Sequence, residues 1–433
     1  MLGFAPVDTS RPNLEGLPSE LLEAARSVGN KLAERGHQSW IVGGAVRDLC
    51  IGRRPSDVDL ATNATPDEVE ALFADVVPLG KRFGTVLVKA LGLGIEVTTL
   101  RAEGGYDDAR RPDSVVFGTS VQVDASRRDF TCNAMYLDSQ TGEFLDPAHG
   151  LADLGAGRLV AVGDPGLRFQ EDGLRIFRLA RFAATLGLEP AEETLAGAKA
   201  SLESLRGVSG ERMMAELTRG FTSGEGLAML RLLSSIGVHQ RVFPEASAGA
   251  PQGSVVVCGE LVNAPDLLMG LLVFVDPDPL GSSSADRSDR TELALDALAL
   301  FRPSRELRGQ FASVWSLCAR LEASSAGDVD RGQLLLWMRE PGWHSAVELA
   351  LAAARARSAD ISVLQSWALE REAVTDETLF PTPWIQPQQL AEAGLAKGPR
   401  WGSVLEESLR MQLGGDLKSA ADARAWLQRQ LEG

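Results

Sequence analysis

The sequence lacks long hydrophobic runs, closely spaced cysteines and a secretion signal, and each absence narrows the class of protein. No apolar stretch among the 433 residues is long enough to span a bilayer, which predicts a protein without a membrane partner. The four cysteines are widely separated and match no zinc spacing. Residues 1–12 lack the basic start and apolar run of a signal peptide. We therefore expect reduced thiols and a cytoplasmic location.

A basic charge balance is also missing. Lys and Arg number 43 against 59 Asp and Glu, a formal net charge of −16 that is spread over both halves of the chain. Proteins that bind nucleic acid through a general electrostatic field are usually basic. The balance argues against tight, sequence-independent RNA binding, so any RNA-binding surface must be a local cluster of arginines. The length predicts two to four domains rather than a single core.

Two aspartates behind a Gly-Gly turn are the most informative feature that is present. Asp57 and Asp59 flank Val58, and on a strand such a spacing places both carboxylates on one face. Ionised oxygens this close repel each other unless a cation lies between them, and Mg²⁺ prefers a few carboxylates plus substrate phosphates. Gly43 and Gly44 allow backbone N–H groups to approach a phosphate closely. The pattern predicts a site for a metal–nucleoside triphosphate.

The hydrophobic periodicity divides the chain into a mixed first part and a helical remainder. The β-rich runs lie at 39–42, 57–61, 84–91, 95–100 and 115–117. The runs 84–91 and 95–100 predict a hairpin, whereas 124–134 has a helical pattern. Beyond about residue 165 the strand pattern disappears, and a helix is expected over 171–186. The layout predicts an α+β protein, with a small mixed sheet in a head that is followed by an all-α remainder.

Five blocks of residues, in order, carry a resemblance to a known family. They are Gly43-Gly44-Ala45-Val46-Arg47-Asp48 with Asp57-Val58-Asp59; Arg127-Arg128-Asp129-Phe130-Thr131-Cys132-Asn133-Ala134; Asp146 with Gly150 and Asp153-Leu154; Glu171-Asp172 with Arg175, Arg178 and Arg181-Phe182; and Glu211-Arg212 with Glu216. On these residues the chain resembles the tRNA nucleotidyltransferase and poly(A) polymerase family, bacterial-type class II, of the DNA polymerase β-like superfamily. The resemblance covers residues 40–217, and no motif is evident from about residue 220 onward.

The resemblance implies a domain organisation and an activity. We expect a DNA polymerase β-like nucleotidyltransferase head over 15–147, a helical neck with the base-recognition helix over 148–220, a helical body over 221–330, and a helical tail over 331–433 that binds tRNA. Such an enzyme adds or repairs the 3′-CCA end of tRNA from CTP and ATP without a template and releases pyrophosphate. The oligomeric state stays open.

Metal and triphosphate binding are expected from the first block. Asp57 and Asp59 are the predicted catalytic metal ligands, for two Mg²⁺ ions that activate the attacking 3′-hydroxyl and neutralise the departing pyrophosphate. Gly43 and Gly44 would receive the triphosphate at a helix N-terminus, and the planar fork of Arg47 suits its oxyanions. Taken alone, the same residues fit solvated aspartates and an Arg47–Asp48 surface pair; the later blocks favour the site.

A third carboxylate, Glu96, has two interpretations. It lies in the second strand of the expected hairpin, where it could face the metals and act in catalysis. It could equally pair with Arg101, or with Lys89 across the hairpin. The sequence does not decide between them.

The next blocks are expected to hold the nucleotide. The resemblance assigns ribose contacts to the block with Arg127, Arg128, Asp129 and Asn133, and helical spacing would place Asp129 and Asn133 on one face. A local Arg–Asp ion pair is the structural alternative. The resemblance also assigns nucleotide binding to Asp172, Arg175, Arg178 and Arg181.

Base selection can be derived from the atoms of Asp172 and Arg175. At positions i and i+3 of one helix they would be neighbours. A carboxylate only accepts hydrogen bonds and a guanidinium only donates. The pair thus fits an amine beside an unprotonated ring nitrogen, as in cytosine and adenine, and refuses uracil and guanine. Solvated helix-surface ion pairs are the alternative interpretation.

Three further features complete the resemblance. Asp107, Arg110 and Arg111 lie in a polar stretch that resembles the family's flexible loop, which is linked to addition of the final A. The block from Asp146 to Asp153 is expected to act as a hinge. Glu211, Arg212 and Glu216 are expected to brace the base-reading helix.

The motifs leave other functions open. A poly(A) polymerase or an A-adding enzyme of the same family shares every block, although the run Lys81 to Val86 favours the CCA-adding type. A catalytically inactive RNA-binding protein would not need paired metal carboxylates. A small-molecule nucleotidyltransferase of antibiotic-modifying type would lack the helix with Glu171-Asp172 and the long helical extension.

Overall fold

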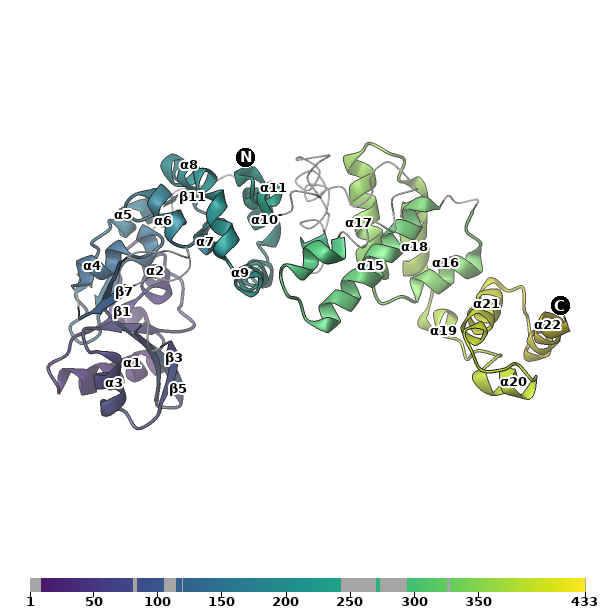
Figure 1. Ribbon diagram of the computed structural model, residues 1–433, viewed down its shortest axis with the longest axis horizontal. Helices are drawn as coiled ribbons and strands as arrows, with labels where there is room; N and C mark the ends of the chain where they lie inside the picture. The colour runs from purple at the N-terminus through teal and green to yellow at the C-terminus, as the bar shows by residue number, and fades with distance from the viewer. Residues whose placement is uncertain are drawn as a thin grey trace. The chain divides into compact units, whose positions relative to one another are not determined.

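The computed structural model describes residues 9–80, 84–104, 114–118, 120–242, 270–272, 294–324 and 328–432. The chain divides into two compact units, one through Val242 and one from Phe243 (Figure 1). Every described strand belongs to the first unit, and the described part of the second unit consists of helices and their connections. The finer division of the chain into four parts stays a prediction.

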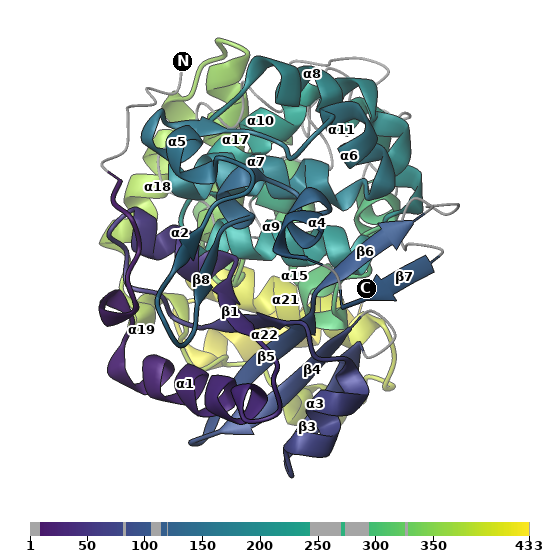
Figure 2. The ribbon, with the colours of Figure 1, turned by 90° about the vertical axis from the view of Figure 1, so that its left-hand side faces the viewer.

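Short hydrophobic strands assemble the sheet of the first unit. Within the described residues, seven strands pair in the order β3-β4-β5-β2-β1-β8-β9 (Figure 2). They are β1 (Ser39–Val42), β2 (Asp59–Thr62), β3 (Val76–Gly80), β4 (Thr85–Ala90), β5 (Leu93–Thr99), β8 (Tyr136–Asp138) and β9 (Phe144–Leu145). β2 and β5 are parallel, and the other neighbours are antiparallel. The expected hairpin is confirmed as β4 and β5, whereas the strand expected from Asp57 begins only at Asp59.

Side-chain alternation gives this sheet two different faces. Trp40 and Val42 of β1 point into a buried cluster that includes Ala61, Ala125 and Tyr136. The residues between them point to the opposite face, because successive side chains of a strand alternate. Helix α1 (Ser19–Ala33) contacts β1, β4 and β5 on that opposite face, and α3 (Pro66–Leu72) packs beside it (Figure 2). The face of Trp40 is therefore the one that meets the following segments of the chain.

The helix expected over 124–134 is wrong. Helix α4 spans Val121–Ser126, and Phe130 is extended and bridges to Ala161 before the 3₁₀ turn η3 (Thr131–Asn133). The carbonyl oxygens of Ser126 and Arg127, which a longer helix would bond internally, instead accept hydrogen bonds from two arginine side chains of a later segment. The N–H of Phe130 donates to the Asp129 carboxylate at 2.8 Å. Tertiary contacts thus outweigh the helical pattern at this point.

The single helix expected over 171–186 is also wrong, because two helices form. Helix α6 spans Pro165–Glu171 and α7 spans Leu174–Leu186, with Asp172 extended between them. Gly173, the next residue, is helical in conformation, and a Cβ there would lie 2.5 Å from the carbonyl oxygen of Ser204. The Asp172 carboxylate accepts the N–H of Leu174 at 3.1 Å and so begins α7. Asp172 and Arg175 therefore do not share one helix face.

Helix bundling completes the first unit. The helices α5 (Gly150–Gly155), α8 (Glu192–Ala200), α9 (Gly210–Thr222), α10 (Gly226–Ile236) and α11 (Val238–Val242) follow α4 or surround α6 and α7. Two short strands, β10 (Arg158–Leu159) and β11 (Glu189–Pro190), pair in parallel. Because β11 lies beyond residue 165, the expectation that the described part of the chain has no strand there is wrong. A ribbon of β6 (Arg101–Gly104) and β7 (Ser114–Phe117) lies outside the main sheet.

The start of α5 is tightly packed. Asp146 accepts the N–H groups of Gly150 and Leu151 at 2.8 and 3.0 Å and caps the helix. A Cβ at Gly150 would lie 2.2 Å from the carbonyl oxygen of Thr131. The Asp153 carboxylate accepts the Thr131 hydroxyl at 2.9 Å. These contacts fix α5 against η3; the hinge expected for this block stays a prediction.

Replacement of Gly150 by alanine is expected to destabilise the protein. The added methyl would overlap main-chain atoms that cannot move independently, so the expected loss is about 1–3 kcal/mol. Gly309→Ala is the control, because nothing lies within 4 Å of a Cβ at that helical position. Thermal unfolding of the full chain compares the two variants, and equal midpoints would contradict the expected clash.

The second unit is built from helices with two aromatic and aliphatic cores. Its longer described helices are α15 (Arg305–Ala323), α16 (Arg331–Met338), α17 (Trp343–Ala356), α18 (Ser362–Ala373), α21 (Arg400–Gly414) and α22 (Ala420–Glu432). Phe311 and Trp315 stack at 5.9 Å within α15. Towards the end of the chain, a separate buried cluster includes Ile385, Leu390 and Trp426. In the part of the chain that the structure describes, no helix combines the length and apolar character that a membrane crossing requires.

Candidate active site

Carboxylates gather at one end of the main sheet. Asp59 lies directly opposite Val42 and beside Glu96 in the parallel pairing of β2 with β5. In-register neighbours point to the same side, so Asp59 and Glu96 share the face of Val42 and lie away from α1. Asp57 is exposed just before β2, and Val58 between the two aspartates is buried. The structure thus brings all three predicted acids to one region.

The proximity of these acids affects the pKa of Asp59. Burial raises the pKa of Asp59, and the charges of Glu96 and Asp57 raise it further, to about 6; the guanidinium of Arg128 opposes them. Lys89, one of the alternative partners of Glu96, contacts Asp75 at 3.6 Å. The mutual repulsion is the situation that a bound cation would relieve.

The donor set for a metal is small. Among the described residues, no three or more His, Cys, Asp or Glu side chains gather closely enough to hold a metal ion by themselves. A magnesium site made from one or two carboxylates and substrate phosphates does not need such a cluster. The residues present therefore fit an ion that arrives with a triphosphate better than a resident structural metal.

Gly43 and Arg47 form the turn beside β1. Gly43 has φ +69° and nothing lies within 4 Å of a Cβ built there, so the turn requires glycine and leaves its surroundings open. It precedes α2 (Gly44–Cys50). Arg47 of α2 donates to Asn133 Oδ1 at 2.9 Å and to Asp48 Oδ1 at 2.8 Å. The Arg47–Asp48 pair exists, but Arg47 also links α2 to η3 rather than lying free on the surface.

Arg127 and Arg128 share a buried acid that the sequence analysis did not single out. Asp124 is 1% exposed; its Oδ1 accepts Arg127 Nη2 at 2.7 Å, and its Oδ2 accepts Arg128 Nη2 at 3.0 Å and the Tyr136 hydroxyl at 2.7 Å. Burial raises the pKa of Asp124, but the charges of Arg128 and Arg127 and the hydrogen bonds outweigh burial and lower it to about 2. The structural interpretation, a local Arg–Asp ion pair, applies to both arginines.

Asp129 and Asn133 do meet, although not on a helix face. Asn133 Nδ2 donates to Asp129 Oδ1 at 3.2 Å, and Arg178 Nε donates to Asp129 Oδ2 at 2.7 Å. Burial raises the pKa of Asp129, whereas Arg178 and the hydrogen bonds lower it to about 2. Together with the Arg47–Asn133 bond, this forms a continuous polar path from α2 through η3 to α7.

Two arginines of α7 and one of α2 surround one aromatic ring. The guanidinium carbons of Arg47, Arg178 and Arg181 lie 5.3, 5.1 and 3.9 Å from the centre of the Phe182 ring. Arg181 Nε donates to the buried Glu216 of α9 at 2.5 Å. Each of these guanidiniums also pairs with a carboxylate, that of Asp48, Asp129 or Glu216, which offsets its charge. Glu216 braces α7 as expected.

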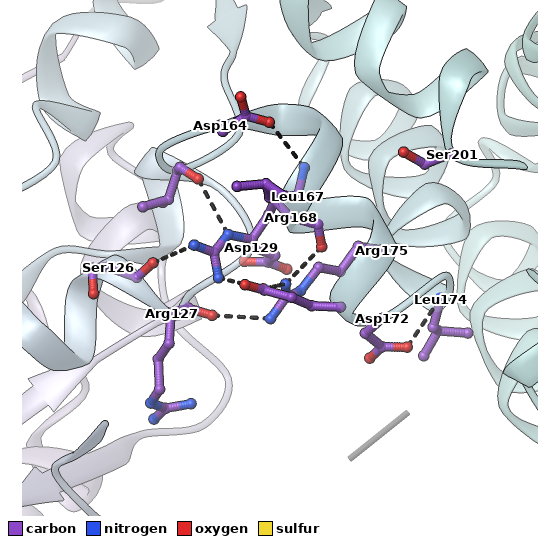
Figure 3. Close-up of polar contacts among 12 residues, drawn as sticks. Ser126, Arg127, Asp129, Asp164, Leu167, Arg168, Asp172, Leu174, Arg175 and Ser201 are labelled. Carbon is purple, nitrogen blue, oxygen red and sulfur yellow. Dashed lines mark hydrogen bonds and ion pairs between the residues drawn. The ribbon is translucent and has the colours of Figure 1, made fainter. Parts of the chain in front are cut away.

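Asp172 and Arg175 are each held by other partners, and Figure 3 shows the bonds of Arg175 to the carbonyl groups of Arg168 and Arg127. Arg212 of α9 donates to both oxygens of Asp172, at 3.1 and 2.7 Å. Arg175 donates from Nη1 to Glu171 Oε2 at 2.6 Å and to the Arg168 carbonyl at 2.7 Å, and from Nη2 to the Arg127 carbonyl at 2.9 Å. These partners use three of the five N–H donors of Arg175.

Some predicted residues fall outside the described part of the chain. Asp107, Arg110 and Arg111 of the expected flexible loop are among them, as are Lys81, Arg82 and Phe83. Their roles stay predictions.

The chain is similar to known proteins both in sequence and in fold. Residues 39–160 match the family model described as the poly A polymerase head domain, and residues 187–249 match the probable RNA and SrmB-binding site of polymerase A. The chain is 47% identical to the CCA-adding enzyme of Bacillus pumilus over 188 residues, 43% of this chain and 47% of that protein. It is 36% identical to the CCA-adding enzyme of Limosilactobacillus reuteri over 272 residues, 62% of this chain and 67% of that protein.

Length limits part of this comparison. The match to the Levilactobacillus brevis enzyme spans 57% of that relative, so the chain spans about half the length of the first curated relatives. Solved structures align more completely. The Bacillus stearothermophilus CCA-adding enzyme in complex with CTP gives a TM-score of 0.67 at 23% identity, over 96% of this chain and 98% of that one. The Thermotoga maritima enzyme complexed with tRNA gives 0.68 at 20%, over 96% and 97%.

The structural matches confirm the expected fold class: a DNA polymerase β-like head with a mixed sheet, followed by a mainly helical remainder. The family matches cover the strand with Trp40 and the helix that holds Glu216. The chain belongs to the class II CCA-adding enzyme and poly(A) polymerase family of nucleotidyltransferases.

Proposed function

We propose that this protein adds or repairs the 3′-CCA end of tRNA, using CTP and ATP and releasing pyrophosphate. The observation that carries the proposal is the group of Asp57, Asp59 and Glu96 beside Arg128, on the sheet face that meets α4. Relatives with 36–47% identity are CCA-adding enzymes, and similar solved structures hold CTP, ATP or tRNA.

The acids and glycines would handle the triphosphate end. The 3′-hydroxyl of the RNA attacks the α-phosphate, and pyrophosphate leaves. Asp57 and Asp59 would hold Mg²⁺, which when bound supplies charge neutralisation at the reacting phosphates. Glu96 completes the acidic group as the third catalytic carboxylate. Gly43, Gly44 and Arg47 lie beside β1, where the open turn and a guanidinium suit phosphate oxygens.

The ribose and base ends would be read by the following segments. Asp129 and Asn133 offer a carboxylate and an amide to the sugar, held in place by Arg178 and Arg47. Arg127 and Arg128 anchor this segment through Asp124, while Arg178 and Arg181 bring positive charge. In the part of the chain that the structure describes, three of the five N–H donors of Arg175 are used, so the other two would serve a ring nitrogen; Asp172 would accept an amine, so cytosine and adenine would be selected.

Localisation and partners follow from the same proposal. The enzyme would act on tRNA in the cytoplasm, with the helical second unit available for the RNA. Cys50, Cys132 and Cys318 are buried free thiols, and burial raises the pKa of Cys50 and of Cys132 to about 12, which suits a reducing compartment.

The deciding experiment measures nucleotide incorporation on a tRNA that lacks its terminal CCA. We expect two C residues with CTP alone, completion to CCA with CTP and ATP, and little addition from UTP or GTP. Addition of A without any C would identify an A-adding enzyme or a poly(A) polymerase instead. Binding of the tRNA without any incorporation would support an inactive RNA-binding protein.

A further inference from the structure

Arg168 connects the base-selecting segment to the head. Its Nη2 donates to the Ser126 carbonyl at 2.6 Å, and its Nε donates to the Val162 carbonyl at 3.2 Å. Its Nη1 donates to Glu171 Oε2 at 2.6 Å. The side chain is 11% exposed, and its contacts join α6 to the end of α4 (Figure 3).

One oxygen atom of Glu171 couples Arg168 to Arg175. Both guanidiniums donate to Glu171 Oε2, each at 2.6 Å. The Arg168 main chain also contacts Arg175, because its carbonyl accepts Arg175 Nη1 at 2.7 Å. The two arginines then bond consecutive carbonyls, those of Ser126 and Arg127. Charge-assisted hydrogen bonds of this kind are directional, so each guanidinium plane is constrained by the other.

We propose that Arg168 is a positioning residue for nucleotide choice, which acts by fixing the orientation of the Arg175 guanidinium through Glu171 and the end of α4. The inference rests on the proposed function, since Arg175 is the donor that would read the base. Without Arg168, Glu171 loses its second cation and its link to Ser126. The Glu171–Arg175 pair can then rotate, and the donors of Arg175 are no longer aimed at one position. Selection between bases requires such fixed donors, because a misplacement of about 1 Å costs about 100-fold in rate.

The test compares kcat/KM for CTP, ATP, UTP and GTP on tRNA that lacks its end. For Arg168→Ala we expect a fall of about tenfold or more with CTP and ATP and little change with UTP and GTP, so discrimination narrows by about tenfold. Arg168→Lys keeps a charge beside Glu171 but cannot reach both carbonyls, so it should restore discrimination in part.

Arg53→Ala is the matched control. Arg53 also donates to a main-chain carbonyl of the α7 segment, that of Thr185, at 3.2 Å, but it has no contact with Glu171 or Arg175 among the described residues. Arg53→Ala should leave kcat/KM unchanged for CTP, ATP, UTP and GTP. An equal fall with all four nucleotides in Arg168→Ala, or unchanged discrimination, would overturn the inference, because the role of Arg168 would then be merely structural or absent.

The same experiment separates this inference from the proposed function. If the wild-type protein incorporates no nucleotide, the proposed function fails, and equilibrium binding of CTP against UTP and of ATP against GTP still tests Arg168. If Arg168→Ala binds CTP over UTP and ATP over GTP with a smaller ratio of affinities than the wild type, the positioning role is supported. If these ratios equal those of the wild type, the positioning role is overturned. Thermal unfolding of each variant shows whether it is folded. If Arg168→Ala is not folded, the nucleotide preference of Arg168→Lys tests the positioning role instead.

Discussion

Asp59→Asn should reduce nucleotide incorporation by at least about 1000-fold. Asparagine keeps the shape of the side chain and the pairing of β2 with β1 and β5, but it removes the charge that faces Glu96 and Asp57. Loss of several kcal/mol of charge stabilisation at the reacting phosphates corresponds to about three orders of magnitude in rate. The measurement is single-turnover addition of CTP to tRNA that lacks its end. Asp57→Asn should have a similar effect.

Asp75→Asn is the matched control for charge. Asp75 lies immediately before β3 of the same sheet, its side chain is 60% exposed, and it contacts Lys89 at 3.6 Å. We expect its turnover to equal that of the wild type. If Asp59→Asn retained turnover within tenfold of wild type at saturating nucleotide, the acids would not form the reaction centre and the proposed function would lose its main support.

Asp124→Ala should cost about 3–5 kcal/mol of stability, the range for breaking a buried ion pair by removing one partner. The substitution leaves Arg127 and Arg128, each about 16% exposed, without their shared carboxylate, and it leaves the Tyr136 hydroxyl without its acceptor. Hydrogen exchange at β1 and α4 of the full chain measures the effect, since it reports the first unit even where the second unfolds separately.

Glu203→Ala provides the comparison for Asp124. Glu203 also pairs with two arginines, Arg206 and Arg241, but its side chain is 70% exposed. Exposed pairs contribute about 0–1 kcal/mol, so hydrogen exchange should change little. Equal effects of the two substitutions would mean that burial of Asp124 between its arginines contributes nothing to the fold.

The same residue predicts a pH dependence. The folded-state pKa of Asp124 is about 2, below the ordinary value of about 3.9 for an unfolded chain. A lowered folded pKa means that the unfolded state binds more protons, so the contribution is complete above about pH 4 and is lost as pH falls towards 2. Stability of Asp124→Asn should therefore decline less steeply between pH 4 and 2. Asp129 has the same direction of shift, so part of the decline should persist.

Local patterns predicted the elements whose partners are close in sequence. The hairpin of β4 and β5 was expected, because the alternation of side chains along two neighbouring strands is a local signal. Arg127 and Arg128 lie three and four residues after Asp124, but this spacing does not reveal that Asp124 is buried, because its burial depends on packing against β8.

The ends of the helices around the proposed base-reading segment could not be predicted from the sequence, because they depend on contacts between distant residues. The pattern over 124–134 ended at Ser126 because Arg168 and Arg175 bond the carbonyls there, and those partners are more than forty residues away in the chain. The break between α6 and α7 falls at Asp172, whose carboxylate accepts two hydrogen bonds from Arg212, forty residues later in the chain. Arg168 was overlooked because its spacing to Glu171 and Arg175 resembles a solvated helix face, and its main-chain acceptors carry no signature in the sequence.

The tight turn between β4 and β5 determines the side of the sheet on which Glu96 lies, although the turn itself is not part of the proposed active site. Leu91 and Gly92 both have positive φ, 51° and 82°, and this two-residue connection sets how β5 aligns with β4. An insertion of one residue there would slip β5 by one position and exchange its two sides. Val97 would then face the reacting phosphates and Glu96 would be driven towards α1. The length of the turn before β5 thus decides whether the third acid is part of the reaction centre.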